Sequence, residues 1–154
     1  MINVKRMIEF CWQHEEDIRR AIAEKRLDNG GVVTGGGGHC RVSDPTAQKA
    51  IHNVSDVPCV EVEYGAYVND MRNVMTIKRP LQWLKAAHWT KEHYADKPQG
   101  ELIKLKYSES LLRNDIVEIM GISQATYYVM LSDIFTYAEG LAAGLKLIPP
   151  KRGR

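Results

Sequence analysis

The stretch from Arg113 to Ser132 constrains the fold most, because its spacing is that of two short helices joined by a tight turn. Gly121 stands at the ninth position, where the chain leaves the first helix through a left-handed conformation that costs glycine almost nothing. Ser123 is expected to cap the second helix. The apolar positions that would fill the wedge between the crossed helices are Ile116, Met120, Ile122, Tyr127 and Met130. This pattern is typical of a DNA-binding helix-turn-helix, although any helical hairpin with a glycine turn would also show it.

A short amphipathic segment precedes this pattern and suits the supporting helix of a three-helix module. It runs from Glu101 to Tyr107, and its Lys104 and Lys106 are placed to lie along a phosphate backbone. Leu112 fits the pattern poorly, because a serine or threonine normally caps the first helix of such a pair.

If this pair of helices binds DNA, the start of the second helix meets the major groove. Ser123 and Thr126 would then contact a phosphate through hydroxyl and backbone N–H groups. Gln124 is the best base reader, because its amide offers a donor and an acceptor together to adenine. Ala125 suits contact with a thymine methyl group. The other expected DNA contacts are Arg113, Tyr128 and Val129.

The rest of the chain is predicted to be mainly helical. Further helices are predicted over Val4–Leu27, from Asp44-Pro45 towards His52, and over Leu81–Tyr94 after Pro80. The glycines from Gly35 to Gly38 favour a flexible connector over a phosphate cradle, because no Gly-Lys-Ser/Thr sequence follows them. The β-branched and aromatic stretch from Val57 to Tyr67 is expected to be either extended or a short connecting turn. We therefore predict an all-α fold.

A turn at Lys97-Pro98-Gln99-Gly100 is predicted to separate the C-terminal module from what precedes it. This divides the chain into a helical N-terminal region over residues 1–98, a helix-turn-helix module over 99–148 and a basic tail over 149–154. A net charge of +2 does not indicate a polyanion partner, so any basic surface has to come from local arrangement.

Cysteine and histidine residues raise the question of a metal or catalytic site. Cys11, His14, His39 and Cys40 are four possible zinc ligands, but adjacent His39 and Cys40 would have to bend sharply to bind one ion. Cys11 instead lies on the apolar side of the first helix, where free cysteine is a small core hydrophobe. An enzyme built around His39, Cys40 and His52 is disfavoured, because their spacing offers no nucleophile, base and orienting group. We expect no catalysis, no metal and no other cofactor.

The chain has no apolar run near 18 residues and no signal-peptide core, which predicts neither membrane spanning nor secretion. Its three cysteines show no regular spacing, which suits reduced thiols in the cytoplasm better than a disulfide framework.

The helix expected from Tyr127 to about Leu145 carries more apolar positions than a small three-helix module covers. Gly140 and Gly144 also form a small-residue patch that lets another helix come close. The covering contact is either the N-terminal helix of the same chain or a second copy. A symmetric dimer is the preferred hypothesis, because paired half-sites multiply operator affinity.

Five segments together resemble phage late-gene transcription activators of the RinA/ArpU type. They are SDPTA (43–47), RPLQWLKAA (79–87), HYADKPQGELIKLKY (93–107), GISQATYY (121–128) and AEGLAAGLKLI (138–148). The resemblance implies a C-terminal module similar to region 4 of sigma factors, double-stranded DNA as ligand and host RNA polymerase as a further partner. It also implies a sequence-specific regulator of phage or prophage late genes in the cytoplasm of a bacterial host.

This chain departs from the pattern directly after the two tyrosines. Similar proteins usually continue with arginines or other polar groups, whereas this chain reads Val129-Met130-Leu131. Met130 belongs inside, and Val129 and Leu131 fall on different sides of it. An exposed apolar residue there suits either thymine methyls or a subunit contact. The alternative function is a small terminase-like DNA-packaging subunit, which also uses a helix-turn-helix but assembles as a ring.

Overall fold

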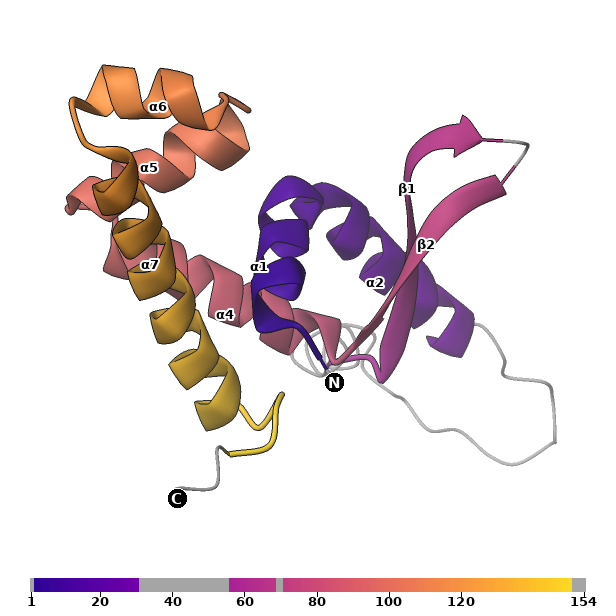
Figure 1. The fold of residues 1–154 in the computed structure, drawn as a ribbon. Coiled ribbons are helices and arrows are strands. Elements are labelled where there is room, and N and C mark those ends of the chain that lie inside the picture. Colours follow the sequence, from indigo (N-terminus) through magenta and orange to yellow (C-terminus); the bar gives the residue numbers. More distant parts are fainter. Residues whose placement is uncertain (1, 31–55, 69–70, 151–154) are drawn as a thin grey trace, which may run out of the picture. The chain divides into compact units, whose positions relative to one another are not determined.

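The structure is a computed structural model that describes residues 2–30, 56–68 and 71–150 (Figure 1). The chain forms two compact units, of which the first joins residues 1–15 to residues 82–154 and the second is residues 16–81. The glycine run at residues 35–38, the helix predicted after Asp44 and the basic cluster at 151–154 lie outside the described residues.

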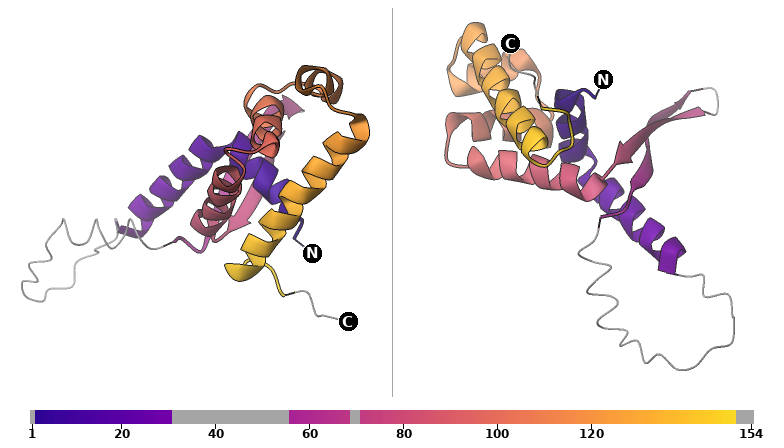
Figure 2. Two further views of the ribbon diagram at one scale, coloured as in Figure 1. Left: turned by 90° about the vertical axis from the view of Figure 1, so that its left-hand side faces the viewer. Right: turned by 90° about the horizontal axis from the view of Figure 1, so that it is seen from below.

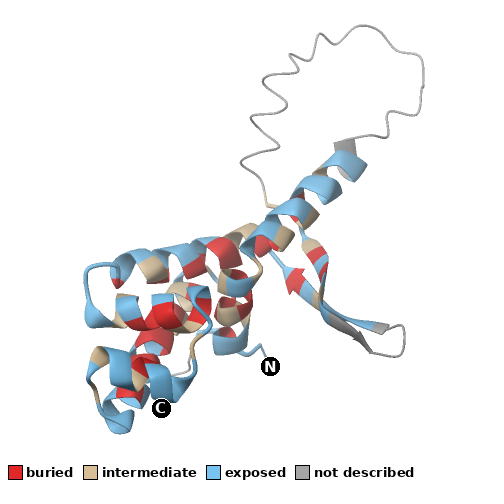
Figure 3. Ribbon diagram, turned by 90° about the horizontal axis from the view of Figure 1, so that it is seen from above, coloured by how far each residue is buried: buried red, intermediate tan, exposed pale blue. Residues whose placement is uncertain are grey.

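The second unit contains a β-hairpin, so the predicted all-α fold is wrong. Strand β1 (Cys59–Val68) pairs antiparallel with β2 (Met71–Lys78), and Val60 lies opposite Ile77. Val60, Val62 and Ile77 are buried near the end of the hairpin that consists of the start of β1 and the end of β2 (Figure 3). The other face of the hairpin is exposed and carries Glu61, Glu63, Val74 and Thr76. This alternation of apolar and polar side chains is what a half-buried strand requires.

The predicted helix from Val4 to Leu27 is two helices, α1 (Val4–Gln13) and α2 (Glu15–Gly30). The chain leaves the helical conformation at His14, where φ is −127° and ψ is 29°. Ile18 and Ile22 of α2 are buried, and α2 lines a cavity of about 360 Å³ together with β1. The apolar residues of α1 are therefore buried in the first unit, and those of α2 are buried in the second unit.

Helix α4 (Pro80–His93) confirms the helix predicted after Pro80. Asp56 Oδ1 accepts a 3.0 Å hydrogen bond from the backbone N–H of Leu81, which satisfies one of the free donors at the start of this helix. Inside the helix, the buried hydroxyl of Thr90 donates to the carbonyl oxygen of Ala86 at 2.8 Å. The buried face of α4 includes Trp83, Leu84, Ala86, Ala87 and Thr90.

The segment predicted as a turn at residues 97–100 is the first turn of helix α5 (Pro98–Ile103), with Pro98 in the first helical position. A Cβ at Gly100 would lie 2.0 Å from the carbonyl oxygen of Tyr94, so this close approach admits only glycine. The chain continues as a π-helix, η1 (Lys104–Ser108), in place of the regular helix expected up to Tyr107. π-Helical turns are often found at functional sites.

Helices α6 (Arg113–Met120) and α7 (Gln124–Gly144) form the predicted helix pair. The residues predicted to fill the wedge between them are buried or half-buried. Helix α7 contacts α1 and α5, and η1 contacts α1, α5 and α6 (Figure 2). Helix α1 of the same chain therefore packs against α7, and it is one of the two partners that the sequence allowed.

Candidate nucleic-acid interface

The turn between α6 and α7 is held by the hydrogen bonds that its sequence predicts. Gly121 is left-handed, with φ 63° and ψ 36°, and its N–H donates to the Glu118 carbonyl oxygen. The N–H of Ile122 reaches back to the carbonyl oxygen of Val117 at 3.1 Å. This pair of backbone bonds is a Schellman motif, which ends α6 and sets the direction in which the chain enters α7.

Ser123 caps α7 as predicted. Its side-chain oxygen accepts a 3.1 Å hydrogen bond from the backbone N–H of Thr126, and the two hydroxyl oxygens lie 2.9 Å apart. Such a cap leaves the other N–H groups of the first turn pointing out of the helix start, where the helix dipole favours an anion. Ser123 and Thr126 are both exposed, so this end of α7 is open to a phosphate.

The predicted base-reading side of α7 is open to solvent. Gln124 and Ala125 are exposed, and Tyr128 and Val129 are 51% and 67% exposed. Tyr127 is buried, as expected. The sequence places Val129 and Leu131 on different sides of Met130, and the structure confirms this, because Val129 is exposed whereas Leu131 is buried.

The two lysines of η1 that were predicted to follow the phosphate backbone differ in their surroundings. Lys104 is exposed, and its ammonium lies 3.9 Å from the carboxylate of Glu109, a long surface ion pair worth little. Lys106 is half-buried and donates a 3.0 Å hydrogen bond to the hydroxyl of Tyr127. Its ammonium also lies 5.5 Å from the centre of the Tyr127 ring. Lys106 is thus positioned by α7, whereas Lys104 is not.

Arg113 links the start of α6 to the exposed side of α7. Its guanidinium donates a 2.6 Å hydrogen bond to the hydroxyl of Tyr128, although the two residues are 15 positions apart. The guanidinium carbon also lies 5.9 Å from the centre of the Tyr128 ring. Because the phenol is neutral, this contact orients both side chains and leaves the positive charge of Arg113 uncompensated.

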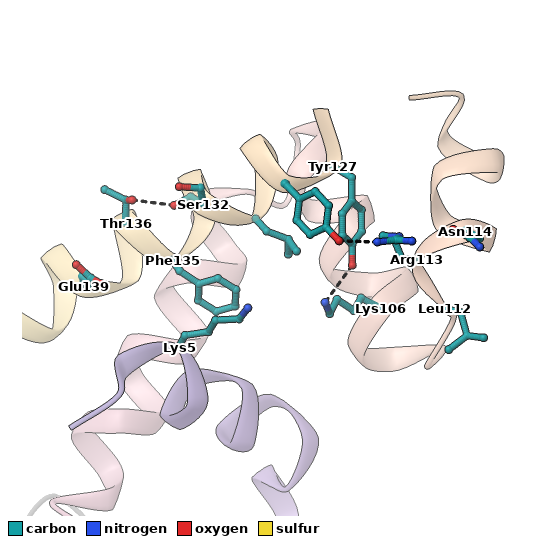
Figure 4. A pocket seen from close by; sticks show the side chains of 12 residues that line it. Lys5, Lys106, Leu112, Arg113, Asn114, Tyr127, Ser132, Phe135, Thr136 and Glu139 are labelled. Atoms are coloured by element: carbon teal, nitrogen blue, oxygen red, sulfur yellow. Dashed lines mark hydrogen bonds between the residues drawn. The ribbon is translucent and has the colours of Figure 1, made fainter. Parts of the chain in front are cut away.

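These contacts border an open groove of about 730 Å³ between α1, η1, the start of α6 and α7 (Figure 4). We call it the cationic groove. It is lined by Lys5, Lys106, Leu112, Arg113, Asn114, Tyr127, Tyr128, Leu131, Ser132, Phe135, Thr136 and Glu139. Lys5 of α1 lies over the ring of Phe135 in α7, 5.4 Å from its centre. Sequence reasoning missed both residues, because they come from opposite ends of the chain and no local spacing relates them.

The distribution of charge gives the cationic groove its importance. Residues 98–150 carry four lysines and arginines against six aspartates and glutamates, a net charge of −2. The first two turns of α7, from Gln124 to Met130, carry no charge at all. The exposed start of α7 therefore has hydrogen-bonding groups that suit DNA bases and phosphates but carries no charge. The positive charge beside it comes from Lys5, Lys106 and Arg113.

Cys11 and His14, two of the four possible zinc ligands, are among the described residues. Burial, with a smaller effect from Glu15, raises the pKa of the Cys11 thiol to about 12. His14 packs its ring 4.4 Å from that of Phe10. Across residues 2–30, 56–68 and 71–150, no cluster of three or more potential metal-binding side chains occurs. His39, Cys40 and His52 lie outside the described residues.

None of the described helices is both long enough and apolar enough to cross a bilayer. Comparisons of the chain with known protein families, with curated proteins and with solved structures found no match.

Proposed function

We propose that this protein is a sequence-specific DNA-binding regulator that reads double-stranded DNA with the exposed start of α7. The observation that carries the proposal is the geometry around Gly121 and Ser123, where a hydrogen-bonded turn leads into a capped helix whose first two turns expose one side to solvent. An α-helix presented in this way fits the width of the major groove.

Each exposed side chain has a role that follows from its chemistry. The amide of Gln124 pairs with the hydrogen-bonding edge of adenine, and the methyl group of Ala125 contacts a thymine methyl. Ser123 and Thr126 hold a phosphate at the start of the helix. Val129, one turn further along the helix than Ala125, adds a second apolar contact in the groove.

The biological setting comes from the resemblance of the sequence. In this proposal the protein regulates late genes of a phage or prophage in the cytoplasm of a bacterial host, with host RNA polymerase as partner. In this role the polymerase catalyses RNA synthesis, and this chain needs no catalytic residue.

Selection from a pool of random duplexes tests whether the protein reads sequence. The full-length protein should enrich duplexes that share a motif, because base contacts are worth about 1 to 3 kcal/mol for each good pair. Bound duplexes without a common motif would show a non-specific binder and would contradict the proposal. Absence of binding even at low salt would reject DNA as the ligand.

A variant with an added negative charge tests whether the start of α7 is the surface involved. Ala125→Glu places a carboxylate in the first turn of α7, where the helix dipole favours it while DNA phosphates repel it. We expect an unchanged melting temperature and affinity for the selected duplex that is lower by about tenfold or more. The matched control is Ala95→Glu, at another exposed alanine, which should bind as the wild type does. Equal affinity of the two variants would place the interface elsewhere.

A further inference from the structure

DNA affinity depends mainly on cations that neutralise phosphates, and the start of α7 provides none. The cationic groove provides three, from three different elements, against one carboxylate in its lining, that of Glu139. Lys5 comes from α1, Lys106 from η1 and Arg113 from the start of α6 (Figure 4). The groove therefore holds the positive charge that the predicted reading surface lacks.

The partners of these three groups leave their charges available. Lys106 and Arg113 donate to the neutral hydroxyls of Tyr127 and Tyr128, and Lys5 lies over the ring of Phe135. Among the described residues, none of the three makes an ion pair with a carboxylate. Aromatic partners hold the cations in place without neutralising them, so the attraction for an outside anion is retained.

The position of the groove indicates which anion it takes. Tyr128 both lines the groove and belongs to the exposed side of α7 that carries Gln124. A duplex whose major groove receives the start of α7 brings its sugar–phosphate backbone past Tyr128 and Arg113. The hydroxyl of Ser132 and the amide of Asn114 also line the groove and can donate to phosphate oxygens.

We infer that the cationic groove binds the phosphate backbone of the same duplex that α7 reads, with Lys5 of the N-terminal helix as a phosphate contact. This inference rests on the proposed function and extends it. It makes α1 part of the DNA-binding surface, although α1 lies outside the helix-turn-helix module that the sequence delimits.

The test compares Lys5→Gln with Lys85→Gln in the full-length protein. These are matched variants, because both lysines are exposed and lie over an aromatic ring, at 5.4 Å from Phe135 and 5.3 Å from Trp89. Affinity for the selected duplex and for a random duplex is measured by fluorescence anisotropy between about 50 and 200 mM salt.

We expect Lys5→Gln to weaken binding to both duplexes by the same factor, and to reduce the slope of log affinity against log salt by about 1. The double variant Lys5→Gln/Arg113→Gln should reduce the slope by about 2, while Lys85→Gln should leave it unchanged. Equal weakening on both duplexes distinguishes a backbone contact from a base contact.

Two results would overturn the inference and leave the proposed function standing. One is a Lys5→Gln salt slope equal to that of Lys85→Gln, with wild-type binding intact. The other is a Lys5→Gln effect that appears with a single-stranded oligonucleotide and not with the duplex, which would assign the groove to a single strand. If the wild-type protein bound neither duplex at any salt concentration, the proposed function itself would fail, and the inference with it.

Discussion

The hydroxyl of Tyr107 in η1 donates a 2.6 Å hydrogen bond to Oε1 of Glu9 in α1, a residue 98 positions earlier in the chain. The ring of Tyr107 also packs 5.0 Å from that of Trp12, whose indole N–H donates to the carbonyl oxygen of Ala87 in α4. These contacts fix α1 against the C-terminal helices. They therefore also fix the backbone that presents Lys5 to the cationic groove.

Removing the Tyr107 hydroxyl should destabilise this unit. Tyr107→Phe deletes a part-buried hydrogen bond to a carboxylate, and hydrogen bonds to charged groups contribute about 1.5 to 3 kcal/mol. Tyr128→Phe is the matched control, because it deletes a bond of the same 2.6 Å length to Arg113 at an exposed position. The free energy of unfolding, measured with urea, should fall by about 2 kcal/mol in the first variant and by under about 0.5 kcal/mol in the second. Equal losses would show that burial does not set the strength of these bonds.

The same tyrosine should make stability depend on alkaline pH. Burial, then the hydrogen bond and charge of Glu9, raise the pKa of Tyr107 above its ordinary value of 10.0. Burial, then the charge of Asp133, raise the pKa of Tyr94 to about 12. A raised pKa in the folded state contributes stability that is complete below pH 10 and is lost as pH rises through the folded value.

We therefore expect the free energy of unfolding to fall from about pH 10 upwards, and to fall less steeply in Tyr107→Phe. Urea unfolding at pH 8, 10 and 11 measures how steeply the free energy of unfolding falls with pH in the wild type and in Tyr107→Phe. The same slope in the wild type and the variant would contradict this role of Tyr107.

Two glycine substitutions should change the stability of the protein in opposite directions. Gly121→Ala adds a methyl group that meets nothing within 4 Å, so its cost is the left-handed backbone alone, about 1 to 2 kcal/mol. Gly140→Ala also has open space around the added Cβ, but lies inside α7, where alanine is favoured over glycine by about 0.5 to 1 kcal/mol. Thermal unfolding should show a lower melting temperature for the first and a higher one for the second. Stabilisation by Gly121→Ala would contradict the turn geometry.

The thiol of Cys11 should be chemically inert in the folded protein. It is 1% exposed, and its pKa near 12 leaves almost no thiolate at pH 8. A variant with Cys40→Ser and Cys59→Ser isolates this thiol. It should react with a disulfide reagent only after unfolding in urea, and rapid stoichiometric reaction of the native variant would rule out the buried position.

The turn at the start of α7 could be predicted because its determinants are local. Gly121 supplies the left-handed residue and Ser123 the cap, and both act within a few positions of themselves. The hairpin could not be predicted in the same way, because β1 gains its partner only through pairing with β2. The alternation of Val60, Glu61, Val62 and Glu63 is the pattern of a half-buried strand, but the sequence alone leaves the stretch from Val57 to Tyr67 open between an extended segment and a short turn.

In the candidate site, too, local features could be predicted from the sequence and long-range contacts could not. The exposure of Gln124, Tyr128 and Val129 follows from helical spacing alone. The cationic groove depends on α1 packing against α7, and no spacing in the sequence brings Lys5 to Phe135. Such contacts depend on packing between segments far apart in the sequence. The break at His14, which separates α1 from α2, is by contrast a local change of the backbone.

The most direct measurement of base reading is the affinity of Gln124→Ala for the selected duplex and for a random one, by anisotropy at fixed salt. Gln13→Ala, at another exposed glutamine, is the control. We expect Gln124→Ala to lose about 1 to 3 kcal/mol on the selected duplex and almost nothing on the random one, with Gln13→Ala unchanged on both. Equal weakening of Gln124→Ala on the two duplexes, or no weakening on either, would show that the start of α7 does not read the DNA sequence through Gln124.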